Sequence, residues 1–185
     1  MLKKVGVYIT SEQFSVSDEL FNAFLRAGDD DFEDEDEEAL FAALDCVSEG
    51  KSNADFPAEE RDDDGTIEIF TEGSLRIADG AVTLTYTETD AENNGTLKTT
   101  LRFYENEPQL VNMVHFGEVN ASFLFEPHKR TKCVYNLPFG AMELTIRTTR
   151  VDNRLVEDGT LVLDYYLEIR GANAEHKRVT INLRT

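Results

Sequence analysis

Apolar and polar residues alternate with a period of two through most of the chain. The alternation is clearest in residues 142–148, where Met142, Leu144 and Ile146 share one face and polar residues occupy the other. Residues 161–169 repeat the pattern. Because successive side chains of a strand point to opposite faces, both runs predict half-buried antiparallel strands.

The same pattern predicts a first strand over residues 2–10 and a meander of strands from Ile67 to the C-terminus, with turn residues between them. We expect a bulge at Gly73, and Asp79-Gly80 has the composition of a tight hairpin turn. An open meander leaves two unpaired edges. We therefore predict an all-β fold, an antiparallel up-and-down calycin- or lipocalin-like β-barrel of about 8–10 strands, with a sandwich as the alternative.

Two short helices are expected between the first strand and the meander. Ser17 is suited to cap the first helix, and Gly50 marks the end of the second. Their apolar stripes need a surface to cover, which is either the barrel mouth, its outer wall or a partner protein. These candidate lid or partner-binding residues are Phe21, Phe24, Leu25, Leu40 and Leu44.

The chain is interpreted as one domain in three parts: the first barrel strand (1–13), an acidic helical insertion and linker (14–65), and the β-barrel (66–185). The net charge of -19 is concentrated in the insertion. Residues 29–64 hold 17 acidic residues against two basic ones, whereas the rest of the chain holds 20 against 16. Because phosphate binding needs a basic face, nucleic acid is not expected as a partner. The acidic insertion is either a solvated arm or a dock for a basic protein partner.

The cysteine content and the N-terminus favour a cytoplasmic protein. Cys46 and Cys133 are interpreted as separate thiols, because two cysteines do not make a disulfide framework. The short apolar run after Lys3 and Lys4 does not have the form of a signal peptide. No apolar run is long enough for a membrane span, so we expect no membrane contact.

Short motifs occur in a fixed order along the predicted barrel. They are T-E-G at 71–73, Y-T-E at 86–88, H-F-G-E-V at 115–119, F-E-P at 125–127, Y-N-L-P-F-G at 135–140, I-R-T within the run ending at Thr148, and G-T-L-V-L-D-Y-Y-L from Gly159. In order and spacing this set resembles the YwiB-like family of small bacterial proteins. The resemblance implies a calycin-like barrel, and the function of that family is not established. It departs at His115, where the family usually has Arg, and it does not extend over the insertion.

If the apolar faces point inward, several polar side chains also lie inside the barrel. These candidate ligand-binding residues are Tyr86, Glu88, His115, Tyr135, Thr148 and Tyr165. A buried carboxylate needs a charge partner or a raised pKa, so we expect Glu88 and His115 to pair. The set either forms a satisfied core network or lines a pocket for a small polar ligand.

Catalysis, metal binding and cofactor binding are not expected. No nucleophile or metal cluster accompanies Glu88 and His115 in the pattern. The other histidines, His128 and His176, do not have zinc-ligand spacing. Residues 60–71 mimic a calcium loop, but Thr71 stands where a bidentate Glu is needed.

The sequence therefore predicts a non-enzymatic protein that binds a small molecule in or at the mouth of its barrel. The alternative is a protein-interaction module with a filled barrel, which uses the acidic insertion or a strand edge.

Overall fold

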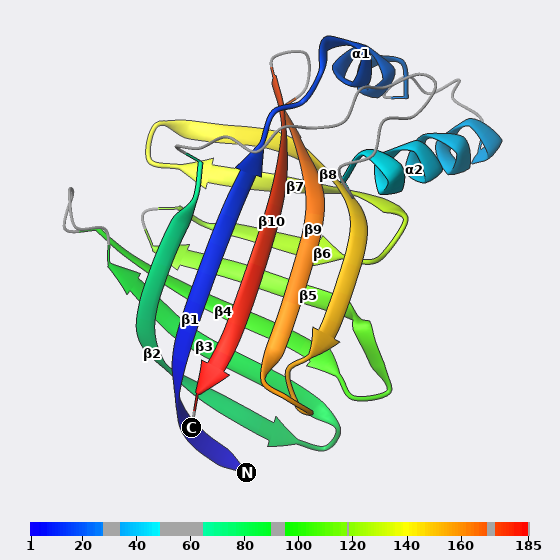
Figure 1. Ribbon diagram of the computed structural model, residues 1–185. Helices are drawn as coiled ribbons and strands as arrows, with labels where there is room; N and C mark the ends of the chain where they lie inside the picture. The colour runs from blue at the N-terminus through cyan, green and yellow to red at the C-terminus, as the bar shows by residue number, and fades with distance from the viewer. Residues whose placement is uncertain (28–33, 49–64, 90–94, 118, 170–172, 185) are drawn as a thin grey trace.

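The computed structural model describes residues 1–27, 34–48, 65–89, 95–117, 119–169 and 173–184. Ten strands form one antiparallel sheet that curls into a nearly closed barrel (Figure 1), which confirms the all-β calycin-like prediction. They are β1 (Leu2–Phe14), β2 (Ile67–Ala78), β3 (Ala81–Thr89), β4 (Thr96–Tyr104), β5 (Glu107–Gly117), β6 (Ala121–Phe125), β7 (Lys129–Leu137), β8 (Gly140–Arg154), β9 (Thr160–Ile169) and β10 (Asn173–Arg184).

The strand order is β6-β5-β4-β3-β2-β1-β10-β9-β8-β7, so the N- and C-terminal strands lie side by side in the middle of the sheet. The two edge strands, β6 and β7, meet and nearly close the barrel. Asn120 and Asn136 form a bridge there, and the Thr131 hydroxyl donates a hydrogen bond of 2.9 Å to the Leu124 carbonyl oxygen. Joining the edges in this way protects backbone groups that an open sheet would expose.

The core is driest near the end of the barrel where both chain termini lie (Figure 1). Apolar side chains from β3, β4, β5, β9 and β10 lie there with almost no exposed surface; they include Val82, Leu84, Phe103, Val111, Leu161 and Ile181. The Asn153 amide donates a 2.8 Å hydrogen bond to the Pro108 carbonyl oxygen, which links β8 to β5 across this end. The hydrophobic effect therefore seals one end of the barrel.

The predicted bulge at Gly73 is wrong, because β2 pairs with β1 in regular register on both sides of this residue, and its regular ladder with β3 starts here. The glycine is needed for close packing instead. A Cβ atom at this position would lie 2.7 Å from the Val7 side chain and 3.0 Å from the Thr85 carbonyl oxygen. The Asp79-Gly80 hairpin is confirmed, with positive φ angles of 55° and 74° that suit a tight turn.

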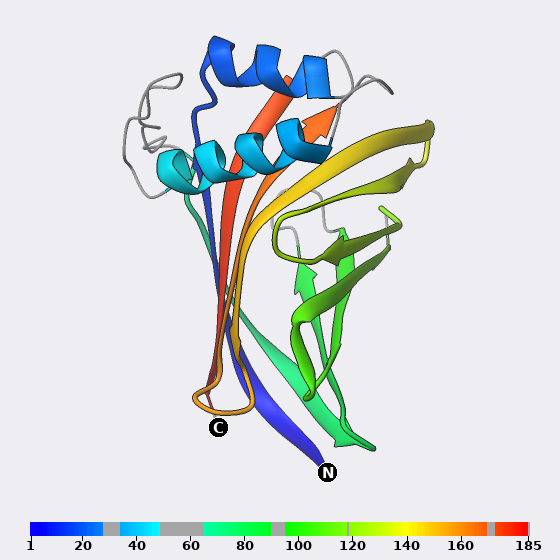
Figure 2. The same ribbon diagram turned by 90° about the vertical axis from the view of Figure 1, so that its right-hand side faces the viewer.

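Two helices, α1 (Asp18–Ala27) and α2 (Asp34–Ser48), lie across the outside of the barrel near the end opposite the termini (Figures 1 and 2). Ser17 caps α1, since its hydroxyl oxygen accepts a hydrogen bond of 3.2 Å from the Leu20 amide. Helix α2 begins inside the acidic run, where negative side chains favour a helix N-terminus.

The helices cover the outer wall of the barrel and not its mouth. Their apolar side chains form one buried cluster with Tyr166 of β9 and Ala174 of β10. Among the residues proposed as lid or partner contacts, Phe24, Leu40 and Leu44 are buried in this cluster and Phe21 is partly buried. They therefore do not form an exposed docking surface. The side chain of Leu25 and the linker 49–64 lie outside the described residues.

Candidate functional site

Three polar side chains on neighbouring strands form a hydrogen-bonded network inside the barrel, toward the end opposite the termini. Glu88 lies on β3, Thr99 on β4 and His115 on β5. Thr99 is directly opposite Tyr86 of β3 on one side and His115 on the other. The Thr99 hydroxyl lies 3.2 Å from Glu88 Oε1 and 3.2 Å from His115 Nδ1. Thr99 is fully buried, whereas Glu88 and His115 are half-buried.

Glu88 and His115 do not form the direct pair that the sequence suggests. Strand β4 lies between their two strands, which places their backbones about 10 Å apart at the usual strand spacing. The Thr99 hydroxyl bridges this gap. Sequence reasoning did not select Thr99, although its position in the alternation with Leu101 and Phe103 could have placed it inside the barrel.

Burial shifts the pKa values of the network in opposite directions for acid and base. It lowers the pKa of His115 from 6.5 to about 4, so the imidazole is neutral at neutral pH. It raises the pKa of Glu88, an effect that the hydrogen bond from Thr99 partly offsets. The pKa of Tyr86 is raised by burial and then by the neighbouring charge of Glu88.

Two acceptor atoms of this network have no protein partner. Within the described part of the chain, no hydrogen bond reaches Nε2 of His115 or Oε2 of Glu88, and neither atom is buried from solvent. Aromatic rings line the space beside His115. The Phe123 ring packs edge-on at 5.2 Å from the imidazole, and the Tyr135 ring lies 6.3 Å from that of Phe123.

The other predicted lumen residues lie on the opposite wall. Tyr135 on β7 and Tyr165 on β9 are half-buried, and Thr148 on β8 is directly opposite Tyr165. The Thr148 hydroxyl is fully buried, and no described residue accepts or donates a hydrogen bond to it. Burial raises the pKa values of both tyrosines, most strongly that of Tyr165.

An ion pair at the same end of the barrel was not predicted. Lys177 Nζ lies 3.0 Å from Glu175 Oε2 on β10, and each side chain is 28% exposed. The two residues share the parity of Val179 and Ile181, which pack in the core, so they point into the barrel. The alternation of β10 could have revealed them.

A second polar network lies on the outer wall, beneath the helices. The carboxylate of Asp164 on β9 bonds His176 of β10 through Oδ1, and its Oδ2 lies 2.7 Å from an Arg178 guanidinium nitrogen. The His176 ring is stacked between Phe14 and Tyr166. Burial alone would raise the pKa of Asp164, but the hydrogen bond from His176 and the charges of His176 and Arg178 lower it.

Arg147 of β8 also lies on this wall and is completely buried. Its guanidinium is 3.8 Å from Glu168 Oε2 and lies over the ring of Phe24 in α1, 5.2 Å from its centroid. Sequence reasoning placed Arg147 on the outer face but did not predict its burial. A side chain on the outer face of a barrel strand is normally exposed to solvent. Arg147 is buried because the helices cover this part of the outer wall.

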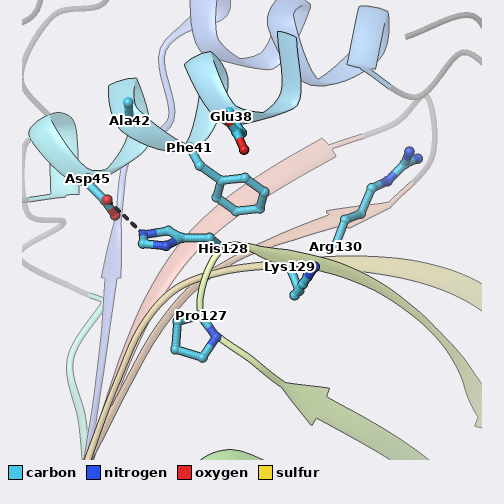
Figure 3. A pocket seen from close by; sticks show the side chains of 8 residues that line it. All are labelled: Glu38, Phe41, Ala42, Asp45, Pro127, His128, Lys129 and Arg130. Atoms are coloured by element: carbon cyan, nitrogen blue, oxygen red, sulfur yellow. Dashed lines mark hydrogen bonds and ion pairs between the residues drawn. The ribbon is translucent and has the colours of Figure 1, made fainter. Parts of the chain in front are cut away.

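An open cleft of about 690 Å³ separates α2 from the turn between β6 and β7 (Figure 3). Acidic side chains of Glu38 and Asp45 come from the helix, and Lys129 and Arg130 come from the strand side. His128 Nε2 lies 2.9 Å from Asp45 Oδ2, with both side chains largely exposed. This contact ties the helix to the turn at the solvent surface.

Among the described residues, no group of three or more His, Cys, Asp or Glu side chains is placed to hold a metal ion. No helix in the described ranges has the length and apolar character needed to cross a membrane.

Ten antiparallel strands around a partly polar interior define a calycin-like barrel protein. The chain belongs to the family described as "Domain of unknown function (DUF1934)", whose model matches residues 56–181. Its fold is similar to that of the YwiB protein from Bacillus subtilis, with a TM-score of 0.59, 17% sequence identity and coverage of 100% of this chain and 96% of that one. The resemblance inferred from the motifs is thereby confirmed. No curated protein matches the sequence.

Proposed function

We propose that the barrel binds a small molecule in or at its mouth and catalyses no reaction. The observation that carries this proposal is a set of interior hydrogen-bonding atoms without partners among the described residues: Thr148 Oγ1, His115 Nε2 and Glu88 Oε2. Buried polar atoms of folded proteins, such as Thr148 Oγ1, are nearly always hydrogen-bonded. A bound molecule would supply that partner and would replace water at His115 Nε2 and Glu88 Oε2.

The contrast between the two ends of the barrel supports entry from the mouth. Toward the termini, the inward-facing side chains are apolar and buried. At the other end, inward-facing apolar residues such as Met142, Leu167 and Ile169 are only partly buried, as are Glu88 and His115 on the opposite wall. A ligand could cover this surface without unfolding the core.

The arrangement of the network supports binding without catalysis. In a nucleophilic triad the histidine lies between the hydroxyl and the carboxylate, so that it can accept the hydroxyl proton. Here the Thr99 hydroxyl lies between Glu88 and His115. The remaining interior nucleophile described, Cys133, is unreactive at neutral pH because burial raises the pKa of its thiol to about 11.

A blocking substitution tests the site. Met142→Trp would fill the mouth from its position opposite Tyr135, whereas Glu143→Trp places the same ring on the exposed outer face of β8. Phenol, followed by NMR on the labelled full chain, should shift the signals of Glu88, His115 and Tyr135 in the wild type and in Glu143→Trp, but not in Met142→Trp. Equal binding to both variants would place the site elsewhere, and no binding to the wild type would refute the proposal.

A protein-interaction function is the second candidate, and an exposed apolar patch over the barrel edges favours it. The patch consists of Val114, Phe116, Leu124, Val134 and Phe139. Phe116 and Phe139 are 69% and 87% exposed, which is unusual for phenylalanine in a monomer. Replacing Phe116 and Val134 by Ser should abolish capture of a protein partner and leave phenol binding unchanged if the two functions are separate.

A further inference from the structure

The hydroxyl of Thr99 carries one proton but has two hydrogen-bond neighbours, Glu88 Oε1 and His115 Nδ1. The hydroxyl donates to Glu88 Oε1, a carboxylate oxygen, which accepts hydrogen bonds in the ionised group. The single proton of Thr99 is therefore directed to Glu88. The Thr99 oxygen is then an acceptor, and Nδ1 of His115 must donate to it.

This order of donors determines the tautomer of His115. A neutral imidazole has one N–H group, so a proton on Nδ1 leaves a lone pair on Nε2. Nε2 is open to solvent, as is Oε2 of Glu88. Both free atoms of the network are therefore acceptors, and neither can donate a hydrogen bond to a ligand.

The described residues around the network add an apolar surface and a cation that is already paired. The ring of Phe123 packs 5.2 Å from that of His115, and the ring of Tyr135 lies 6.3 Å from that of Phe123. Lys177, the cation described among the inward-facing residues near the mouth, is held by Glu175 at 3.0 Å. The negative charge of Glu88 is thus not balanced for an anionic ligand.

We propose that the mouth selects small molecules that carry a hydrogen-bond donor, a hydroxyl or amino group, on an apolar or aromatic body, and that it rejects carboxylates and phosphates. This inference rests on the proposed binding function. The donor bonds Nε2 of His115 or Oε2 of Glu88, and the body packs against Phe123 and Tyr135. An anion meets only acceptors and the charge of Glu88.

The tautomer can be measured directly. In the ligand-free full chain at pH 7, long-range proton–nitrogen NMR correlations of the imidazole should show His115 protonated on Nδ1. A histidine free in water prefers the other tautomer, so this result would not arise without the hydrogen bond to Thr99. Protonation on Nε2 would overturn the proposal.

Matched probes then test the ligand class. Phenol should bind about tenfold more tightly than anisole, which keeps the ring but has no donor and so leaves the acceptors of the site without a partner. Benzylamine should bind and benzoate should not. Equal binding of phenol and anisole would overturn the donor requirement while leaving the barrel a binding protein. Absence of binding by all four probes would refute the proposed function, and this inference with it.

Two isosteric variants on β4 test whether the Thr99 hydroxyl determines the ligand preference. Thr99→Val removes the hydroxyl that orders the donors, so His115 can take either tautomer and the preference for phenol over anisole should fall toward one. Thr100→Val removes a hydroxyl from the opposite face of β4, where it lies 3.4 Å from that of Thr85, and should leave the preference unchanged. An unchanged preference in a folded Thr99→Val protein would contradict the proposal, as would a Thr100→Val protein that loses it.

Discussion

The protein contains two histidine networks with similar residues and opposite surroundings. Inside the barrel, His115 is joined to the carboxylate of Glu88 only through the Thr99 hydroxyl, and solvent reaches its free ring nitrogen. On the outer wall, His176 bonds the Asp164 carboxylate directly and is completely buried between two aromatic rings.

The comparison shows that the face of a strand does not decide burial. The inward-facing network is the more accessible of the two, because Glu88 and His115 are half-buried, whereas the outward-facing one is covered by α1 and α2. The buried outer network is completed by charge pairs that join β8, β9 and β10. The inner network has unused hydrogen-bonding capacity, which is what a binding site requires.

The largest expected effect is a difference in stability: a substitution on the buried outer wall should destabilise the protein far more than one in the inner network. Arg147→Met removes the cation 3.8 Å from the buried carboxylate of Glu168, and we expect a loss of about 3–5 kcal/mol in unfolding free energy by chemical denaturation. Changing both residues to Met should restore most of this loss, since no buried charge is then left without its partner. Glu88→Gln, in the half-exposed inner network, should cost only about 1 kcal/mol. If Glu88→Gln costs more than Arg147→Met, the comparison is wrong.

The second effect is a pH dependence that belongs to the inner network. The pKa of His115 is lowered from 6.5 to about 4, so the unfolded chain binds a proton more readily and stability falls as the pH falls from 6.5 to 4. The loss should reach up to about 3 kcal/mol relative to His115→Gln, which cannot titrate. Unfolding free energies of both proteins at several pH values measure it.

Two carboxylates, Glu88 and Asp164, also contribute to the pH dependence of stability. The raised pKa of Glu88 has the opposite sign, because it adds stability at low pH that is lost as the pH rises through the folded pKa; it is present in both proteins and largely cancels. The lowered pKa of Asp164 keeps this group ionised throughout the window, so the stability it adds is lost only below 3.8. Parallel pH profiles of the wild type and His115→Gln would disprove the assignment to His115.

Replacing either of two neighbouring threonines on β8 by Val should change the stability of the protein in opposite directions. Thr148→Val replaces a buried hydroxyl that has no described partner and should stabilise the ligand-free protein by about 1 kcal/mol. Thr149→Val removes a 3.0 Å hydrogen bond to the Asp164 carbonyl oxygen and should destabilise it by about 1 kcal/mol. Thermal unfolding of the two variants gives the signs. Destabilisation by Thr148→Val would mean that the hydroxyl is already partnered, for instance by an ordered water.

The smallest effect concerns the solvent-exposed contact between α2 and the barrel. Asp45→Asn weakens the 2.9 Å contact with His128, and because both side chains are largely exposed we expect a loss of about 0.5 kcal/mol or less. Hydrogen exchange of α2 amides, at low and high salt, measures it. A loss as large as that of Arg147→Met would show that the helix is held at its edge and not by its buried face.

Much of the barrel could be predicted from the sequence, because strand parity is a local property. Alternation identified the strands, the hairpin at Asp79-Gly80 and the inward direction of Tyr86, Glu88 and His115. It failed at Gly73, where a close approach between strands, and not a bulge, requires glycine. It also missed Thr99, since threonine is common on either face of a strand and only its neighbours in space give it a role.

The order of apolar and polar residues by itself determined the all-β fold, the presence of two amphipathic helices and the set of side chains that face the interior, since each follows from contacts with residues a few positions away. Only the tertiary structure decided which surface the helices cover, that Arg147 and His176 are buried on the outer wall, and that Thr99 stands between Glu88 and His115. These outcomes depend on strand order and on the packing of distant segments, and no short-range pattern encodes them.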